Sequence, residues 1–176
     1  NTASLTLDVV PVRWWSWVGG SSATNQFGCY GTKGGAAEEN WPGARTGSGF
    51  CRGTNDTLWL FGGSGYASAA SGLLNDLWAF DGVEWAWMSG SNTVNSRGVY
   101  GTKGTPSEGN MPGGRQSSLL WMDSSGRLWL FGGNGHDATG ASGELNDLWR
   151  YDGTNWTWIS GSSVANQYGV YGTMHV

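Results

Sequence analysis

Short hydrophobic runs separated by glycine and polar turns make up most of the chain, and they show no helical periodicity. Residues 116–122 and 128–131 are two such runs, with Asp-Ser-Ser-Gly as a turn between them. A third run over residues 148–151 leads into Asp152-Gly153, a hairpin signal because that turn needs positive φ at its central residues. In the fourth run, residues 155–159, two tryptophans alternate with polar residues, as one face of a strand requires. The pattern predicts four short antiparallel strands.

These four runs belong to an internal repeat with a period of 70 residues, and the second copy carries one inserted residue. The sequence Leu-Trp-Leu-Phe-Gly-Gly occupies residues 58–63 and recurs at residues 128–133. Paired tryptophans and Tyr-Gly-Thr triplets each occur three times at the same spacing: Trp15/Trp17, Trp85/Trp87 and Trp156/Trp158, with triplets starting at Tyr30, Tyr100 and Tyr171. A single four-stranded sheet cannot bury both of its faces, so the repeated sheets are expected to stack on one another.

The order of motifs inside each copy resembles the kelch repeat of β-propellers, in the galactose-oxidase-like superfamily. A Gly-Gly doublet ends a hydrophobic strand, Asn-Asp-Leu-Trp follows, and an aromatic residue precedes Asp-Gly and then a tryptophan. The matching residues are Gly62-Gly63, Phe80 and Trp85 in one copy, and Gly132-Gly133, Tyr151 and Trp156 in the other. The period exceeds the usual kelch length of about 50 residues. The long connector with Tyr-Gly-Thr-Lys-Gly resembles kelch-repeat proteins predicted to be exported by bacteria.

The resemblance implies an all-β fold of propeller blades, each a four-stranded antiparallel sheet, and it leaves the function open. It divides the chain into a partial blade with the last two strands (1–20), a connector (21–43), a blade (44–90), a connector (91–113), a blade (114–161) and a connector tail (162–176). The chain is therefore expected to hold about two and a half blades, whereas closed propellers have typically four to eight.

Two explanations fit this open array. Several copies of the chain can assemble, head to tail, into a ring or a filament, or the chain can be a piece of a longer propeller that contains the remaining blades. The start, Asn-Thr-Ala-Ser without an initiator Met, is expected of a mature, processed protein or of an excised piece. We favour assembly, because a lone open array would expose sheet faces and edges.

Composition narrows the class of partner. With 32 glycines, 13 tryptophans, 12% charged residues and a net charge of −4, the chain has no basic stripe, so nucleic acid is an unfavourable partner. Its apolar runs of about five residues are too short for a membrane span. Many Ser, Thr, Asn and Gly residues beside only two lysines fit an exported surface, so we expect an extracellular or cell-surface location.

Tryptophan is expected to build the core between the blades. The paired tryptophans could instead stack on sugars, using flat apolar rings with a polar N–H. Their recurrence in every repeat favours packing between adjacent blades. The predicted blade-packing core consists of Trp15, Trp17, Trp59, Trp78, Trp85, Trp87, Trp129, Trp149, Trp156 and Trp158.

Alternating strand direction places the tight turns at one end of each blade and the long segments, residues 62–74 and 132–145 with the connectors, at the other end. Any glycan or protein partner is expected at this long-loop face, since loops on a rigid scaffold commonly carry function. Trp41, Tyr66 and His136 fall in these loops and are not repeated as the same residue. They are the candidates for surface contact.

Cys29 and Cys51 are the only cysteines, and neither is repeated. A pair within one connector and its following strand suggests a disulfide in an oxidising compartment. Two buried apolar thiols are the alternative. The only histidines, His136 and His175, do not sit at ligand spacing, so we expect no metal and no cofactor.

Two pairs of charged residues recur with the repeat. Arg45 and Arg115 follow a Pro-Gly sequence and are expected to bond a neighbouring connector or blade, with a ligand role as the less favoured interpretation. Asp76 and Asp147 stand beside the third strand and are interpreted as residues that bond the backbone in turns. Neither pair predicts catalytic carboxylates.

Galactose oxidase raises the question of copper-radical chemistry, which needs a cysteine cross-linked to tyrosine and further Tyr and His ligands. The chain has no such cluster, no nucleophile elbow and no phosphate loop, so we expect no enzyme. The expected function is a non-enzymatic, extracellular structural or interaction role, as a subunit of a multi-chain propeller or fibre. The alternative is a carbohydrate- or protein-binding module that uses the long-loop face. Asn55 and Asn155 match the N-glycosylation acceptor.

Overall fold

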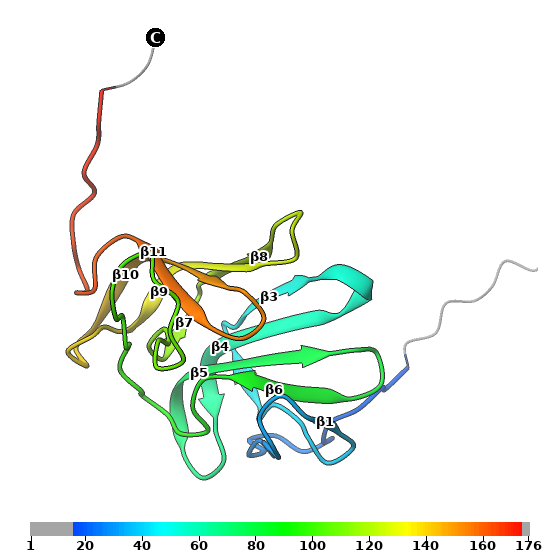
Figure 1. Ribbon diagram of the computed structural model, residues 1–176. Helices are drawn as coiled ribbons and strands as arrows, with labels where there is room; N and C mark the ends of the chain where they lie inside the picture. Colours follow the sequence, from blue (N-terminus) through cyan, green and yellow to red (C-terminus); the bar gives the residue numbers. More distant parts are fainter. Residues whose placement is uncertain (1–15, 174–176) are drawn as a thin grey trace, which may run out of the picture.

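The computed structural model describes residues 16–173, which fold into two antiparallel β-sheets that pack face to face (Figure 1). The predicted all-β class is confirmed. Most of the predicted partial blade over residues 1–20, including Trp15, lies outside the described residues. Within residues 16–173 the two sheets form neither a closed barrel nor a closed ring of sheets.

Sheet 1 has the strand order β1-β6-β5-β4-β2, and β3 pairs with the same edge of β4 as β2 does. β2 and β3 are thus two halves of one interrupted edge strand, because Gly47 between them adopts a positive φ of 65°. The bounds are β1 (Ala36–Ala37), β2 (Arg45–Thr46), β3 (Gly49–Arg52), β4 (Leu58–Tyr66), β5 (Ser71–Phe80) and β6 (Trp85–Ser89), with a 3₁₀ turn at Thr54–Asp56.

Sheet 2 repeats this arrangement with the order β11-β10-β9-β7, and β8 pairs with β9 beside β7. The edge strand is again interrupted, here at Ser117, whose φ is 57°. The bounds are β7 (Arg115–Gln116), β8 (Leu119–Met122), β9 (Leu128–His136), β10 (Ser142–Tyr151) and β11 (Trp156–Ser160).

The two middle strands of each sheet, β4 and β5 or β9 and β10, are longer than we predicted from the hydrophobic runs. The expected long loops over residues 62–74 and 132–145 are largely hairpin strands, and only residues 67–70 and 137–141 form the turns. The reason lies in the glycine doublet: Gly62 and Gly63 both adopt positive φ, and the register between β4 and β5 shifts there. This β-bulge lets the strand continue past the doublet where the sequence suggested a loop.

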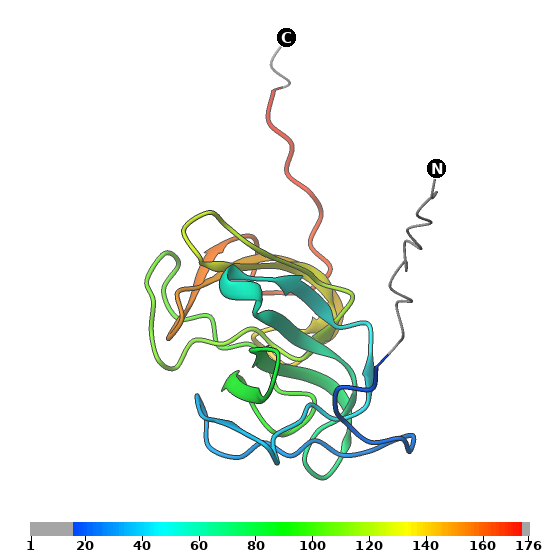
Figure 2. The ribbon, with the colours of Figure 1, turned by 90° about the vertical axis from the view of Figure 1, so that its right-hand side faces the viewer.

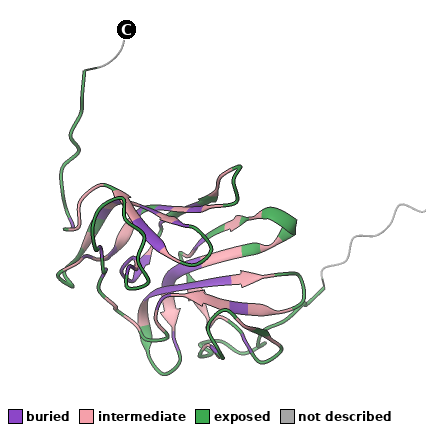
Figure 3. Ribbon diagram, viewed as in Figure 1, coloured by how far each residue is buried: buried purple, intermediate pink, exposed green. Residues whose placement is uncertain are grey.

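The hydrophobic core lies between the two sheets, at what we call the inner interface (Figure 3). Sheet 1 contributes Phe61 and Leu77 to this core. Sheet 2 contributes Leu128, Leu130 and further side chains on the same face of that sheet. The rings meet edge on, with 5.7 Å between the ring centroids of Phe61 and Trp156. Tryptophan therefore supplies much of the apolar area that aliphatic residues supply in most cores.

The later part of each connector packs on the sheet that follows it in the chain. In the first connector, Gly34 N–H donates to Trp87 O (2.7 Å), and in the second, Gly104 N–H donates to Trp158 O (2.8 Å). Two edge contacts follow the same rule, since β1 pairs with β6 and Ser107 forms a bridge with Trp156. The structural unit is therefore a connector with its following sheet, residues 21–90 and 91–161.

Candidate functional site

A buried ion pair lies at the centre of sheet 2. Arg115 donates from Nη1 and Nη2 to the two carboxylate oxygens of Asp147, at 2.6 and 2.8 Å. The same carboxylate accepts the hydroxyl of Tyr100 (2.5 Å) and the indole N–H of Trp149 (2.7 Å). Both members of the ion pair are fully buried. Tyr100 comes from the connector, so this centre fastens the connector to the sheet.

Sheet 1 contains the same centre. Arg45 donates to both oxygens of Asp76 at 2.7 and 2.8 Å, and Asp76 accepts from Tyr30 (2.7 Å) and Trp78 (2.8 Å). The prediction that each arginine bonds a neighbouring segment agrees with this geometry only in part, because its main partner is the aspartate of its own sheet. The interpretation of Asp76 and Asp147 as turn residues is wrong.

The electrostatics of the centre in sheet 2 stabilise the carboxylate. Burial raises the pKa of the Asp147 carboxyl, but the Arg115 charge and hydrogen bonds from Arg115, Tyr100 and Trp149 outweigh burial and leave the pKa lowered. Burial and the negative charge of Asp147 together raise the pKa of Tyr100 well above its usual value. The pair is held as Arg⁺ and Asp⁻ beside a protonated tyrosine, with its hydrogen bonds directed within the protein.

The exposed aromatic surface lies on the sheet faces that point away from the inner interface. On sheet 2 this outer face carries Phe131, which is 42% exposed, whereas the equivalent Phe61 of sheet 1 is fully buried at the inner interface. We define the sheet 2 outer face by Leu119, Trp121, Trp129 and Phe131. Trp121 and Trp129 stack on it with 6.2 Å between their ring centroids. In general, contiguous exposed apolar patches are typical of interaction sites.

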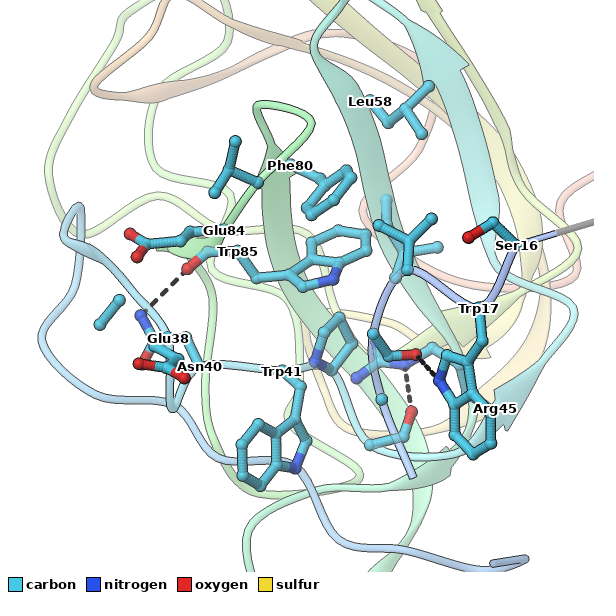
Figure 4. Close-up of a pocket in the computed structure, with 18 residues that line it drawn as sticks. Ser16, Trp17, Glu38, Asn40, Trp41, Arg45, Leu58, Phe80, Glu84 and Trp85 are labelled. Carbon is cyan, nitrogen blue, oxygen red and sulfur yellow. Dashed lines mark hydrogen bonds between the residues drawn. The ribbon is translucent and has the colours of Figure 1, made fainter. Parts of the chain in front are cut away.

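The sheet 1 outer face is the counterpart. Leu58 is 45% exposed there, whereas the equivalent Leu128 is fully buried at the inner interface. We define this face by Phe50, Leu58, Leu60, Phe80 and Trp85. A cleft of about 1020 Å³ opens over it and extends to Trp41 and Glu84 (Figure 4). The residues on the two outer faces are thus the repeat equivalents of the residues that are buried at the inner interface.

The predicted tryptophans occupy different environments. Trp78, Trp149 and Trp156 are fully buried. The other predicted core tryptophans of the two sheets are partly buried: Trp59, Trp85, Trp87, Trp129 and Trp158. Trp17 is 64% exposed and lies in no strand, so its predicted core role is wrong in this structure.

The predicted surface residues do not form one site. Trp41 borders the cleft on sheet 1 and donates its indole N–H to Phe27 O (3.3 Å). Tyr66 packs its ring edge against Phe27, with 5.4 Å between the centroids. His136 lies on sheet 2 and is bonded locally to Gly140 O and the Ser142 hydroxyl. Of the three, only Trp41 borders the cleft over an outer face.

The predicted disulfide is not formed, and Cys29 and Cys51 are free thiols. The two lie on opposite sides of sheet 1. Cys29 belongs to the connector, where it pairs with Trp41 through two backbone hydrogen bonds of 3.0 Å. Cys51 faces sheet 2, and burial raises the pKa of its thiol to about 11. The sequence separation alone did not reveal that a sheet stands between them.

The remaining candidates stay as predictions. Asn55 is exposed in the 3₁₀ turn, and Asn155 is half-buried immediately before β11. Among residues 16–173, no group of three or more His, Cys, Asp or Glu side chains could hold a metal ion. The same residues contain no helix long and apolar enough to cross a membrane.

No protein-family model matches the chain, and no curated protein matches it.

Proposed function

We propose that this protein is a non-enzymatic, extracellular structural or interaction protein, built of kelch-type blades, whose copies stack head to tail through their outer faces. Two sheets with the same strand order and the same Arg–Asp–Tyr centre support the blade interpretation. The kelch-like order of motifs supports the family, and the composition supports the location.

One observation carries the proposal. Equivalent positions are buried at the inner interface and exposed on the outer faces, as Phe61 and Phe131 or Leu128 and Leu58 show. The sheet 2 outer face of one copy therefore has the chemistry to pack on the sheet 1 outer face of another, as sheet 1 packs on sheet 2 within the chain. Such a contact is heterologous, and it closes into a ring or continues as a filament.

The experiment is the native mass by light scattering over a range of concentrations. The wild-type protein is expected to exceed its chain mass of 18.7 kDa. Phe131→Asp blocks one outer face and Leu58→Asp blocks the other, so each variant alone is expected to stay monomeric. A mixture of the two is expected to form a dimer, because each variant keeps the face that the other lacks. Ser125→Asp, in an exposed turn, is the matched charge control.

A wild-type protein that stays monomeric at every concentration would overturn the proposal. Association that survives both face variants would place the interface elsewhere and would equally overturn it.

A second candidate uses the cleft on the sheet 1 outer face as a binding site for a carbohydrate. Trp41, Phe80 and Trp85 line the cleft beside Glu38 and Glu84, which combines flat apolar rings with hydrogen-bonding groups. Binding on a glycan array that is lost in Trp41→Ala and Trp85→Ala but retained in Phe131→Asp would favour this function over stacking.

A further inference from the structure

The last described segment, residues 162–173, matches the first part of the internal connector in sequence, and we call it the C-terminal arm. Its first half is anchored on sheet 2: Asn166 N–H donates to Glu144 O (2.8 Å), and Ala138 N–H donates to Ser163 O (3.0 Å). The internal connector is anchored on sheet 1 by the same two contacts, from Asn95 to Leu73 O (2.7 Å) and from Ser68 to Asn92 O (3.1 Å). The arm thus leaves sheet 2 with the geometry of an internal connector.

Beyond Asn166 the arm extends away from both sheets (Figures 1 and 2). Its Tyr171 is 93% exposed, whereas the equivalent Tyr30 and Tyr100 are 5% and 6% exposed. Each of those two tyrosines donates its hydroxyl to the aspartate of an Arg–Asp pair. Tyr171 therefore has the sequence and the starting geometry of a residue that seats on such a pair.

The segment equivalent to the arm at the other end of the chain is poorly seated. Residues 16–27 are all exposed. Gly90 and Gly161 fit tightly, since a Cβ at either would approach the carbonyl oxygen of Asn75 or Asn146 to 2.1 Å. At the equivalent Gly20 a Cβ would meet nothing within 4 Å. Displacing residues 16–25 therefore sacrifices few contacts, whereas residues 26–29 bond to their surroundings, for example from Gly28 N–H to Ala67 O (3.0 Å).

We propose that the C-terminal arm of one copy exchanges with the equivalent segment of a second copy, so that Tyr171 replaces Tyr30 on the Arg45–Asp76 pair of that copy. This inference rests on the proposed stacking. In the exchanged state, the sheet 2 outer face of the donor lies on the sheet 1 outer face of the acceptor, as sheet 1 lies on sheet 2 within the chain. The arm then follows the path that residues 91–102 follow internally.

The exchanged segments have nearly the same sequence. The arm sequence Gly-Val-Tyr-Gly-Thr stands where the acceptor has Gly-Cys-Tyr-Gly-Thr, so the contacts of the tyrosine are conserved. The gain is the burial of both outer faces. Two contacts of Lys33 are lost, because the sequence has Met174 at the equivalent position: Lys33 Nζ lies 4.5 Å from the centroid of the Trp87 ring and donates to Gly90 O (3.0 Å). Domain swapping of an equivalent element commonly produces such assemblies at low cost.

Cysteine cross-linking of the full chain tests the exchange. Cys29 pairs with Trp41 across an antiparallel bridge, and Val99 pairs with Met111 in the same way. The proposal therefore places Val170 of the donor opposite Trp41 of the acceptor. With Cys29→Val and Cys51→Ala as background, Val170→Cys combined with Trp41→Cys is expected to give covalent chains of two or more copies under mild oxidation. Val164→Cys combined with Trp41→Cys is the matched control and is expected to stay uncross-linked.

Substitutions in the exposed arm supply the second measurement without endangering the fold. Tyr171→Ala is expected to weaken association by about tenfold or more, and Val164→Ala is expected to leave it unchanged.

The outcomes separate the two proposals. If the protein associates through its outer faces but the Val170–Trp41 cross-link is missing and Tyr171→Ala has no effect, the exchange is overturned and the stacking stands. If the wild-type protein is monomeric, both fall.

Discussion

The two repeats of this protein have nearly the same internal bonds but very different surroundings. Both bury an Arg–Asp pair under a connector tyrosine, and both place a connector lysine over a tryptophan ring, at 4.5 Å in the first and 4.2 Å in the second. Yet the face of sheet 2 that carries Leu128 and Leu130 is covered by sheet 1, whereas the equivalent face of sheet 1, with Leu58 and Leu60, borders an open cleft.

This difference shows which structural features form within one repeat and which require a neighbouring repeat. The polar centre forms in both surroundings, so it depends on the connector and its sheet alone. The burial of the outer leucine and aromatic positions differs between the repeats, so it depends on a neighbouring sheet. A repeat array of this kind is stabilised by bonds within each unit together with contacts between units.

Removing the arginine of each Arg–Asp–Tyr centre is expected to give the largest difference in stability between the two repeats. Arg115→Ala leaves the Asp147 carboxylate buried without its partner, which is expected to cost about 3–5 kcal/mol of the free energy of unfolding. Arg45→Ala is expected to cost less, because Arg45 borders the cleft, so that removal of its side chain lets water from the cleft reach the buried Asp76 carboxylate. Chemical denaturation of the two variants measures the difference. Equal losses would show that the cleft does not hydrate the first centre.

Truncating one equivalent leucine in each repeat probes the apolar contribution. Leu128→Ala removes a fully buried side chain and is expected to cost about 2–5 kcal/mol. Leu58→Ala, at the exposed equivalent position, is expected to cost less than about 1 kcal/mol in the monomer. Denaturation at a concentration below association gives both values. A large loss in Leu58→Ala at that concentration would contradict the open outer face.

The pH dependence of stability gives the smallest effect. Because the pKa of Asp147 is lowered by folding, its contribution is complete above about pH 4 and is lost as the pH falls below that value. Because the pKa values of Tyr30 and Tyr100 are raised, their contribution is complete below about pH 10 and is lost at higher pH.

The matched variants Tyr30→Phe and Tyr100→Phe are therefore each expected to reduce the loss of stability above pH 10, as followed by thermal melts across pH. An unchanged alkaline limb in both variants would exclude these hydroxyls as its cause.

The sequence alone predicted most of the strands, but it did not predict which residues from distant parts of the chain would contact one another. The repeat, the turn at Asp152-Gly153 and the run at residues 128–131 all mark elements that form, since they depend on local backbone preferences. The β-bulge at Gly62-Gly63 was missed because glycine after a hydrophobic run also signals a loop.

The polar centre was missed for a different reason. Arg115 and Asp147 are 32 residues apart and meet only when β7 and β10 enter one sheet. The signal that could have found them is their joint recurrence with Tyr100, because all three residues repeat together with Arg45, Asp76 and Tyr30. The disulfide prediction failed similarly, since spacing along the chain does not tell on which side of a sheet a cysteine lies.

The placement of each connector on the sheet that follows it determines where the chain divides into modules. The junctions fall at Gly90–Ser91 and Gly161–Ser162, between one sheet and the connector of the next. Duplicating a gene segment between these junctions would lengthen the array and leave every tyrosine with its own aspartate. A duplication that is out of register with the repeat would separate them, so growth of such a protein by whole modules preserves the polar bonds.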